Sequence, residues 1–519
     1  MSTHLGGLAT LVGSQPLPVD PTPIETPGVD WGAAAPLMVL VGGALVLMLA
    51  SSLVRNRRMT VPYTVVTCLV ALGSAAAAIP LWREVTDPDR GPFSTMAGAV
   101  GVDGFSVFMI VVIAVAVVLA ALFADGYLRR EGLESVEPYV LLLLSASGGV
   151  IMAQANDLIV LFLGLEILSI AVYVLAASHR KRVTSQEAGI KYFVLGAFSS
   201  AFFLYGIAMI YGGVGTTNLV DILGTFSANA LAEDGLVLAG LALMLVGLGF
   251  KVAAVPFHFW TPDVYQGSPS PMVAWMASGV KVAGFAGLIR VFVLAFESYR
   301  VDWQPMVYAV AVATLVVGAV LAVVQTDVKR MMAYSSINHA GWVLVGVQAA
   351  TEDGVQAALF YLATYTFLIA GTFGVITLVG RKGDAHHSLD DYRGLARTRP
   401  MLALTMTVFL FAQAGVPLTS GFFAKFYVIN AAVDAGSTWL AVIAMITSVI
   451  SAFLYLRITV SLYMSDPDEA DSAPRLLIPA AAGIALAVCL VVTLVVGVWP
   501  NGVADLARDA VPVLSVTSG

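Results

Sequence analysis

The sequence predicts an all-α protein that crosses a membrane about fourteen times. Of its 519 residues, 59% are apolar and 11% are charged, whereas about 25% are charged in an ordinary soluble domain. The mean hydropathy is +0.89. Apolar segments of about 20 residues recur along the chain, which is the length that one helix needs to cross a bilayer. Helices are expected because unpaired backbone groups are costly in lipid, and no alternating segments indicate a β-barrel.

Fourteen apolar segments are candidate membrane helices. They are residues 33–54, 61–82, 104–124, 138–153, 157–177, 187–211, 236–258, 271–297, 303–325, 328–350, 354–380, 401–433, 438–463 and 475–499. The fourth is short, and the twelfth is long and contains the interruption GVPLTSG. Their order predicts five regions: an extended Pro-rich lead-in over 1–32, helices 1–3 over 33–124, helices 4–8 over 138–297, helices 9–13 over 303–463, and helix 14 with a tail over 475–519.

Basic residues are distributed unevenly between the loops on the two sides of this predicted bundle. Sixteen lie on one side: Arg55, Arg57, Arg58, Arg129, Arg130, Arg180, Lys181, Arg182, Lys329, Arg330, Arg381, Lys382, Arg393, Arg397, Arg399 and Arg475. The other side has Arg83, Arg90, Arg300 and Arg508. Because loops rich in lysine and arginine stay on the cytoplasmic side, we expect the first set inside and both termini on the outer face.

Several ionisable side chains lie within predicted helices, where a charge at the helix centre costs about 2.5–3.5 kcal/mol. The set comprises four of the seven lysines and one glutamate: Lys191, Lys251, Lys281, Lys425 and Glu166. Movement of the ammonium toward the headgroups would explain Lys191 as well as a functional role would. For the other four, a functional role is favoured.

Other polar features of the sequence favour simpler interpretations. Arg290 and Arg457 lie away from the centres of their predicted helices, and a structural role is favoured for both. Cys68 and Cys489 lie in separate apolar segments and predict neither a disulfide framework nor a metal site. The net charge of −7 without a basic stripe predicts no nucleic-acid partner.

Two prolines interrupt predicted helices close to these lysines. Pro256 has no N–H, so the carbonyl four residues earlier loses its helical partner, and Pro417 has the same effect in helix 12. His258 would lie two turns beyond Lys251, on about the same helical face. Broken helices at membrane depth mark ion sites in transporters, so these two breaks are candidate functional elements.

The two breaks also resemble each other in sequence. AAVPFHF at 253–259 aligns with AGVPLTS at 414–420, and the same offset places helices 4–8 on helices 9–13. Because five is an odd number, the second copy would have the opposite orientation, as in the inverted repeats of secondary transporters. The expected fold is therefore a polytopic membrane protein with two inverted five-helix repeats, in which helices 7 and 12 are broken.

Four segments carry a resemblance to a known family. FKVAAVPFHFWTPDVYQGSPSP, EAGIKYFVLGAFSS, DVKRMMAYSSINHAGW and GVPLTSGFFAKFYV resemble the antiporter-like subunits of respiratory complex I, and specifically look like subunit N of bacterial NADH:quinone oxidoreductase. The TPDVYQGSP segment discriminates best, because the sister subunits L and M usually have LPDA-type sequence there. The resemblance covers all fourteen segments and leaves out only the Pro-rich lead-in.

The resemblance implies that a chain of charged residues near the midplane carries protons. Glu166 would pair with Lys251 on the broken helix 7. Lys281 on helix 8 would be the central relay, and Lys425 on the broken helix 12 would lead toward the outer face. Secondary positions on the path would be Lys191 and His258. A buried lysine suits this role because burial disfavours its charged form, whereas a nearby carboxylate favours it.

The resemblance also implies the setting in which the chain works. It would be a non-redox subunit of a proton-translocating oxidoreductase in the bacterial cytoplasmic membrane, in contact with lipid and with sister and small membrane subunits. It would bind no cofactor, and NADH, flavin, iron–sulfur clusters and quinone would be bound by partner subunits. Three alternatives remain open: a subunit of a free-standing multisubunit sodium/proton antiporter, a purely structural membrane scaffold, and a subunit of a closely related photosynthetic complex that oxidises ferredoxin.

Overall fold

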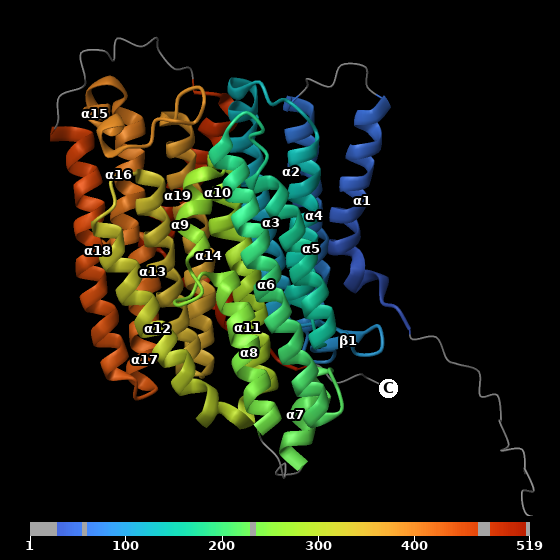
Figure 1. Ribbon diagram of the computed structural model, residues 1–519. Coiled ribbons are helices and arrows are strands. Elements are labelled where there is room, and N and C mark those ends of the chain that lie inside the picture. Colours follow the sequence, from blue (N-terminus) through green and yellow to red (C-terminus); the bar gives the residue numbers. More distant parts are fainter. Residues whose placement is uncertain (1–27, 54–59, 229–234, 465–477, 515–519) are drawn as a thin grey trace, which may run out of the picture.

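Residues 28–53, 60–228, 235–464 and 478–514 are described by a computed structural model, in which they form one bundle of helices (Figure 1). Arg55, Arg57, Arg58, Arg475 and most of the predicted lead-in lie outside these residues. Both described ends of the chain lie at the same end of the bundle (Figure 1), as an even number of crossings requires. The side of the membrane that this end faces stays a prediction.

The first three predicted helices are α1 (Trp31–Leu53), α2 (Thr60–Val85) and α3 (Gly104–Glu131). Asp103 caps α3, because its carboxylate accepts the backbone N–H of Ser106 at 2.9 Å. A small antiparallel hairpin of β1 (Phe93–Thr95) and β2 (Val100–Val102) precedes it. This hairpin was not predicted from the sequence.

The first repeat consists of α4 (Glu137–Gln154), α5 (Leu158–Ala176), α6 (Val183–Val214), the broken pair α8 (Gly235–Val252) and α9 (Trp260–Gly267), and a continuous helix over 270–295. The short α7 (Leu219–Ala228) was not predicted. The continuous helix contains α10 (Ser270–Trp275), the π-helix η1 (Met276–Val280), α11 (Lys281–Leu288) and a second π-helix, η2 (Ile289–Ala295). Such π-helical turns are frequent at functional sites.

The second repeat begins with η3 (Glu297–Tyr299) and consists of α12 (Arg300–Val323), α13 (Val328–Ala349), α14 (Glu352–Val379), the broken pair α16 (Pro400–Ala414) and α17 (Ser420–Asp434), and α18 (Thr438–Met464). Between α14 and α16 lie η4 (Leu389–Tyr392) and α15 (Leu395–Thr398). The helix α19 (Ala480–Val498) and the short α20 (Asn501–Asp509) complete the described chain.

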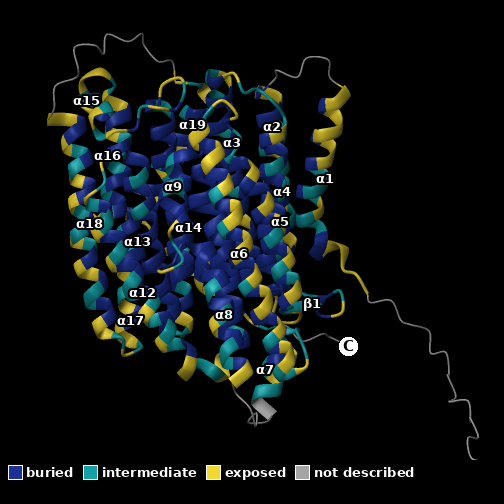
Figure 2. Cartoon of the chain, viewed as in Figure 1, coloured by how far each residue is buried: buried dark blue, intermediate teal, exposed yellow. Residues whose placement is uncertain are grey.

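The fold class predicted from the sequence is confirmed. Eleven described helices are long and apolar enough to cross a membrane, and α4, α13 and the α16–α17 pair supply the three other predicted crossings. The α8–α9 pair runs upward in Figure 1 and the α16–α17 pair runs downward, as inverted repeats require. Apolar side chains are exposed around the outside, and the buried residues lie in the centre (Figure 2).

Both helix breaks occur where the prolines predicted them. The helix α8 ends at Val252, and residues 253–259, which contain Pro256, connect it to α9. The helix α16 ends at Ala414, and residues 415–419, which contain Pro417, connect it to α17. The expected helical relation between Lys251 and His258 is wrong, because the chain between them is not helical.

Candidate functional site

Lys251 is buried in the last turn of α8, directly before the first break, with 3% of its surface exposed. Its ammonium donates a hydrogen bond to Ser169 Oγ at 2.8 Å, and it lies 5.8 Å from the centre of the Tyr192 ring. A lysine at this depth has one hydroxyl and one aromatic face as its described partners. The charged form of Lys251 therefore needs a further hydrogen-bond acceptor or counter-charge.

Glu166 forms no direct ion pair with Lys251 among the described contacts, and its approach through a single water stays a prediction. Ser169, three residues after Glu166 on α5, accepts the hydrogen bond from the Lys251 ammonium instead. Glu166 Oε1 is buried and has no hydrogen-bond partner among the described residues. The carboxylate therefore lies one helical turn from the hydroxyl that Lys251 contacts.

A small void of about 10 Å³ adjoins Lys251 and is lined by polar groups of Ser169, Tyr173, Ser199 and Ser200. A void of this size holds about one water molecule. The hydroxyl of Ser199 is buried without a partner among the described residues. A water here would have the polar neighbours that a buried water needs.

Lys281 is buried at the junction of η1 and α11. Its ammonium donates to the backbone oxygen of Ser336 at 2.5 Å and to Ser336 Oγ at 2.6 Å, and it lies 5.8 Å from the centre of the Tyr365 ring. Gly284, one turn later, packs on the stem of Lys251: a Cβ added there would lie 3.3 Å from Lys251 Cγ. Lys251 and Lys281 therefore lie on adjoining helix surfaces.

Lys425 lies on α17 beside the second break. Its ammonium donates to the backbone oxygen of Ala414, the last residue of α16, at 3.0 Å and to Ser448 Oγ at 2.7 Å. It also lies 5.1 Å from the Trp342 ring. The break thus has a direct consequence, because a carbonyl without a helical partner is available to hold the lysine.

His339 is the important residue that the sequence analysis missed. It is buried on α13, with Nδ1 2.6 Å from Tyr361 Oη and Nε2 3.1 Å from Tyr455 Oη. The Tyr455 hydroxyl is also 2.7 Å from Ser335 Oγ. A neutral histidine between two phenols can donate a hydrogen bond through one ring nitrogen and accept one through the other, so it can relay a proton between them.

Three residues on one face of α13 connect Lys281 to Lys425. Ser336 holds Lys281, His339 follows one turn later, and Trp342 lies against Lys425 one turn after that. We call Ser336, His339 and Trp342 the α13 row. The spacing of three residues in SSINHAGW could have indicated this row from the sequence, but only charged residues were considered as site candidates.

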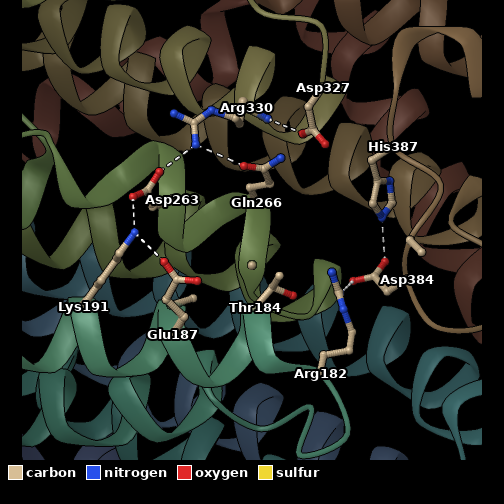
Figure 3. Close-up of a pocket in the computed structure, with 13 residues that line it drawn as sticks. Arg182, Thr184, Glu187, Lys191, Asp263, Gln266, Asp327, Arg330, Asp384 and His387 are labelled. Atoms are coloured by element: carbon tan, nitrogen blue, oxygen red, sulfur yellow. Dashed lines mark hydrogen bonds and ion pairs between the residues drawn. The ribbon is translucent and has the colours of Figure 1, made fainter.

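Lys191 lies in a polar cavity of about 390 Å³ at one end of the bundle (Figure 3). Its ammonium is 2.7 Å from Glu187 Oε1 and 2.7 Å from Asp263 Oδ2. Asp263 Oδ1 is in turn 2.6 Å from Arg330 Nη1. Lys191 is therefore paired and 41% exposed, in contrast to the buried Lys251, Lys281 and Lys425.

We call this end of the bundle the basic end, because the described segments that are rich in lysine and arginine lie there. They are residues 129–132, 178–183, 324–330 and 380–400. Asp384 is fully buried at this end, with Oδ2 3.0 Å from Arg182 and 3.4 Å from Lys329, and Oδ1 2.8 Å from His387 Nε2. Burial raises the pKa of Asp384, but the charge of Lys329, the hydrogen bond with His387 and the charge of Arg182 together hold it well below its usual range.

The remaining predicted residues have the following places. His258 is half-buried in the first break, and its Nδ1 has no partner among the described residues. Pro256 is exposed on the outside of the bundle. Arg290 pairs with Asp103 at 2.7 Å, and Arg457 donates to backbone oxygens at the end of α12 and just beyond. Among the described residues, no group of His, Cys, Asp and Glu side chains is arranged to hold a metal ion.

Comparisons with known proteins place this geometry in a family. Residues 155–451 match the family described as "NADH:quinone oxidoreductase/Mrp antiporter, TM". The chain is 42% identical to NADH-quinone oxidoreductase subunit N of Trichlorobacter lovleyi over 85% of this chain and 89% of that protein. A chain of respiratory complex I from Thermus thermophilus is 33% identical, with a TM-score of 0.76 over 91% of this chain and 99% of that one.

A chain of the Mrp complex from Dietzia has a similar fold, with a TM-score of 0.80 over 93% of this chain and 97% of that one, at 23% identity. This likeness concerns the fold alone. The identity to subunit N proteins is higher and extends over most of the chain. The chain therefore belongs to the subunit N family of antiporter-like membrane proteins.

Proposed function

We propose that this chain is the proton-translocating subunit N of an NADH:quinone oxidoreductase. The observation that carries the proposal is that Lys251, Lys281 and Lys425, buried within the membrane helices, are each held by a serine hydroxyl at a helix break or a π-helical turn. Within the hydrocarbon core a permanent charge on each of these side chains would be costly. A lysine can be neutral or charged, and each of these three has polar groups beside its ammonium. Such side chains suit proton transfer.

The proposed path begins at the cavity around Lys191. Tyr192, the next residue, contacts the ammonium of Lys251 with its ring and stacks on Trp260 with ring centres 4.3 Å apart. Because Asp263 lies one turn after Trp260 on α9, the Lys191–Asp263 ion pair and this aromatic stack join the same two helices. Opening of the ion pair would loosen the stack between the cavity and Lys251.

From Lys251 the path continues along the α13 row. A proton would move to Lys281, then through His339 and its two phenols to Lys425. Glu166 would raise the proton affinity of Lys251 when it approaches and lower it when it withdraws. These groups interact and would titrate as a set. The secondary role of His258 is the least supported, because the break separates it from the helical face of Lys251.

Energy for this transfer must come from outside the chain. Moving one proton against the membrane potential requires about 2.3 kcal/mol per 100 mV. We infer that redox partners with NADH, flavin, iron–sulfur clusters and quinone supply it, and that this subunit acts without a cofactor of its own. The basic end then faces the cytoplasm and both termini face outward.

Purification of the tagged chain with its natural partners tests the proposal. We expect co-purifying subunits that contain flavin and iron–sulfur clusters, and NADH-driven proton transport in proteoliposomes that continues when sodium is replaced by choline. The alternative, a sodium/proton antiporter subunit, predicts no redox partners and transport that requires sodium. A structural scaffold predicts that loss of the buried lysines leaves transport unchanged.

A further inference from the structure

A second cavity, of about 230 Å³, lies at the basic end between the ends of α3, α14, α16 and α19. Its wall is apolar and includes Phe123, Leu402 and Ala482. Two arginines, Arg130 and Arg399, also line it, and no acidic side chain does. The cavity therefore combines positive charge with an apolar wall, at the level where helices end.

Arg130 is held so that part of its guanidinium remains available. Its Nε is 2.8 Å from Glu131 Oε1, and its Nη1 donates to the backbone oxygen of Thr377 at 2.6 Å. Its Nη2 is buried and has no hydrogen-bond partner among the described residues. A buried donor without a partner costs about 1–3 kcal/mol, so an acceptor in the cavity would be stabilising.

The guanidinium of Arg399 has fewer partners than that of Arg130. This residue directly precedes α16, and none of the described residues forms an ion pair or side-chain hydrogen bond with it. Burial and then the positive charge of Arg381 lower the pKa of Arg399. An anion between Arg399 and Arg130 would offset both effects.

We propose that this cavity binds the phosphate of an anionic phospholipid, with an acyl chain along the apolar wall. Arginine forks match phosphate oxygens in geometry, and basic pockets between membrane helices on the cytoplasmic side bind anionic headgroups. Ile478 lines the cavity and is 47% exposed, so the site is open to the surrounding lipid.

Photocrosslinking at Ile478 tests this proposal on the intact complex. The residue is replaced by p-benzoyl-phenylalanine, and the complex is reconstituted in equal amounts of phosphatidylglycerol and phosphatidylcholine with the same acyl chains. Irradiation, digestion and mass spectrometry then identify the adduct on the peptide that contains residue 478. We expect phosphatidylglycerol adducts in roughly tenfold excess, unchanged by millimolar inorganic phosphate.

Substitutions separate this site from general lipid contact. Arg130→Gln with Arg399→Gln should reduce the ratio of the two adducts to about one. If that double variant does not assemble, Arg399→Gln is tested alone. This variant should assemble because it removes no described side-chain contact, and it should lower the ratio because it removes one positive charge from the cavity. Arg393→Gln is the control, since Arg393 lies at the same end, pairs with Asp390 and does not line the cavity.

Three results would overturn the proposal. Equal adducts with both lipids in the wild type would show that the cavity does not select charge. A preference that Arg399→Gln leaves undiminished would assign the selectivity to other residues. Crosslinks to residues 466–471 of this chain or to another subunit, or loss of the lipid adduct in inorganic phosphate, would identify a different occupant.

Discussion

Asp384→Asn should destabilise the basic end far more than any exposed substitution nearby. The carboxylate is fully buried and compensates Arg182 and Lys329, of which Lys329 is itself fully buried. Asparagine keeps the size but removes the charge, and breaking a buried pair from one side costs about 3–5 kcal/mol. Because 1.4 kcal/mol is a factor of ten, the locally open fraction should rise roughly 100-fold or more.

The effect should depend on pH in a defined direction. The pKa of folded Asp384 is held below its usual range, so its stabilisation is present above the unfolded value, near pH 3.9, and is lost as the pH falls through the folded value. The difference between wild type and variant should therefore be complete at neutral pH. It should shrink only in strong acid.

Limited proteolysis of the intact complex measures this opening, with trypsin cleavage after Arg381 and Lys382 as the signal. Asp390→Asn is the matched control, because this nearby carboxylate is 74% exposed and forms a surface ion pair with Arg393, worth at most about 1 kcal/mol. Equal cleavage of the two variants at neutral pH would refute the assignment of Asp384 as the buried counter-charge.

Three further substitutions follow from the same geometry. Gly421→Ala should lower the melting temperature of the complex, since its Cβ would overlap the backbone oxygen of Ala412, whereas Gly212→Ala, in open space, should not. His339→Gln should reduce proton uptake in vesicles roughly tenfold or more with assembly intact, because amide nitrogens do not titrate; unchanged uptake would remove it from the path. Asp263→Asn should slow uptake while stability changes by at most about 1 kcal/mol, and equal rates would argue against a role of the Lys191–Asp263 ion pair in the path.

The arrangement of the helices was predictable because lipid imposes simple rules on sequence. Length and apolarity located every crossing, and Pro256 and Pro417 located both breaks. The short α7 and α20, with 10 and 9 residues, lie below the length that signals a crossing. The hairpin over 93–102 was missed because its three-residue strands are too short for an alternating pattern to be evident.

The site was predictable in its charged members and not in its connections. Buried lysines are conspicuous in an apolar sequence, but the sequence cannot tell that Ser169 rather than Glu166 contacts Lys251. Nor does it show that Asp263 binds Lys191 from a helix 72 residues away along the chain. His339 is not among the lysines, arginines and carboxylates that were considered and was overlooked, although its environment of Tyr361 and Tyr455 makes it the centre of the α13 row.

Proton uptake by the Lys281→Arg variant tests the central claim most directly. Arginine keeps the positive charge but does not release its proton at physiological pH, so a relay residue cannot be replaced by it, whereas a structural cation can. Inverted vesicles with equal complex content are compared for wild type, Lys281→Ala and Lys281→Arg. We expect assembled complexes and lost NADH-driven proton uptake in both variants, and wild-type uptake by Lys281→Arg would assign Lys281 a structural role.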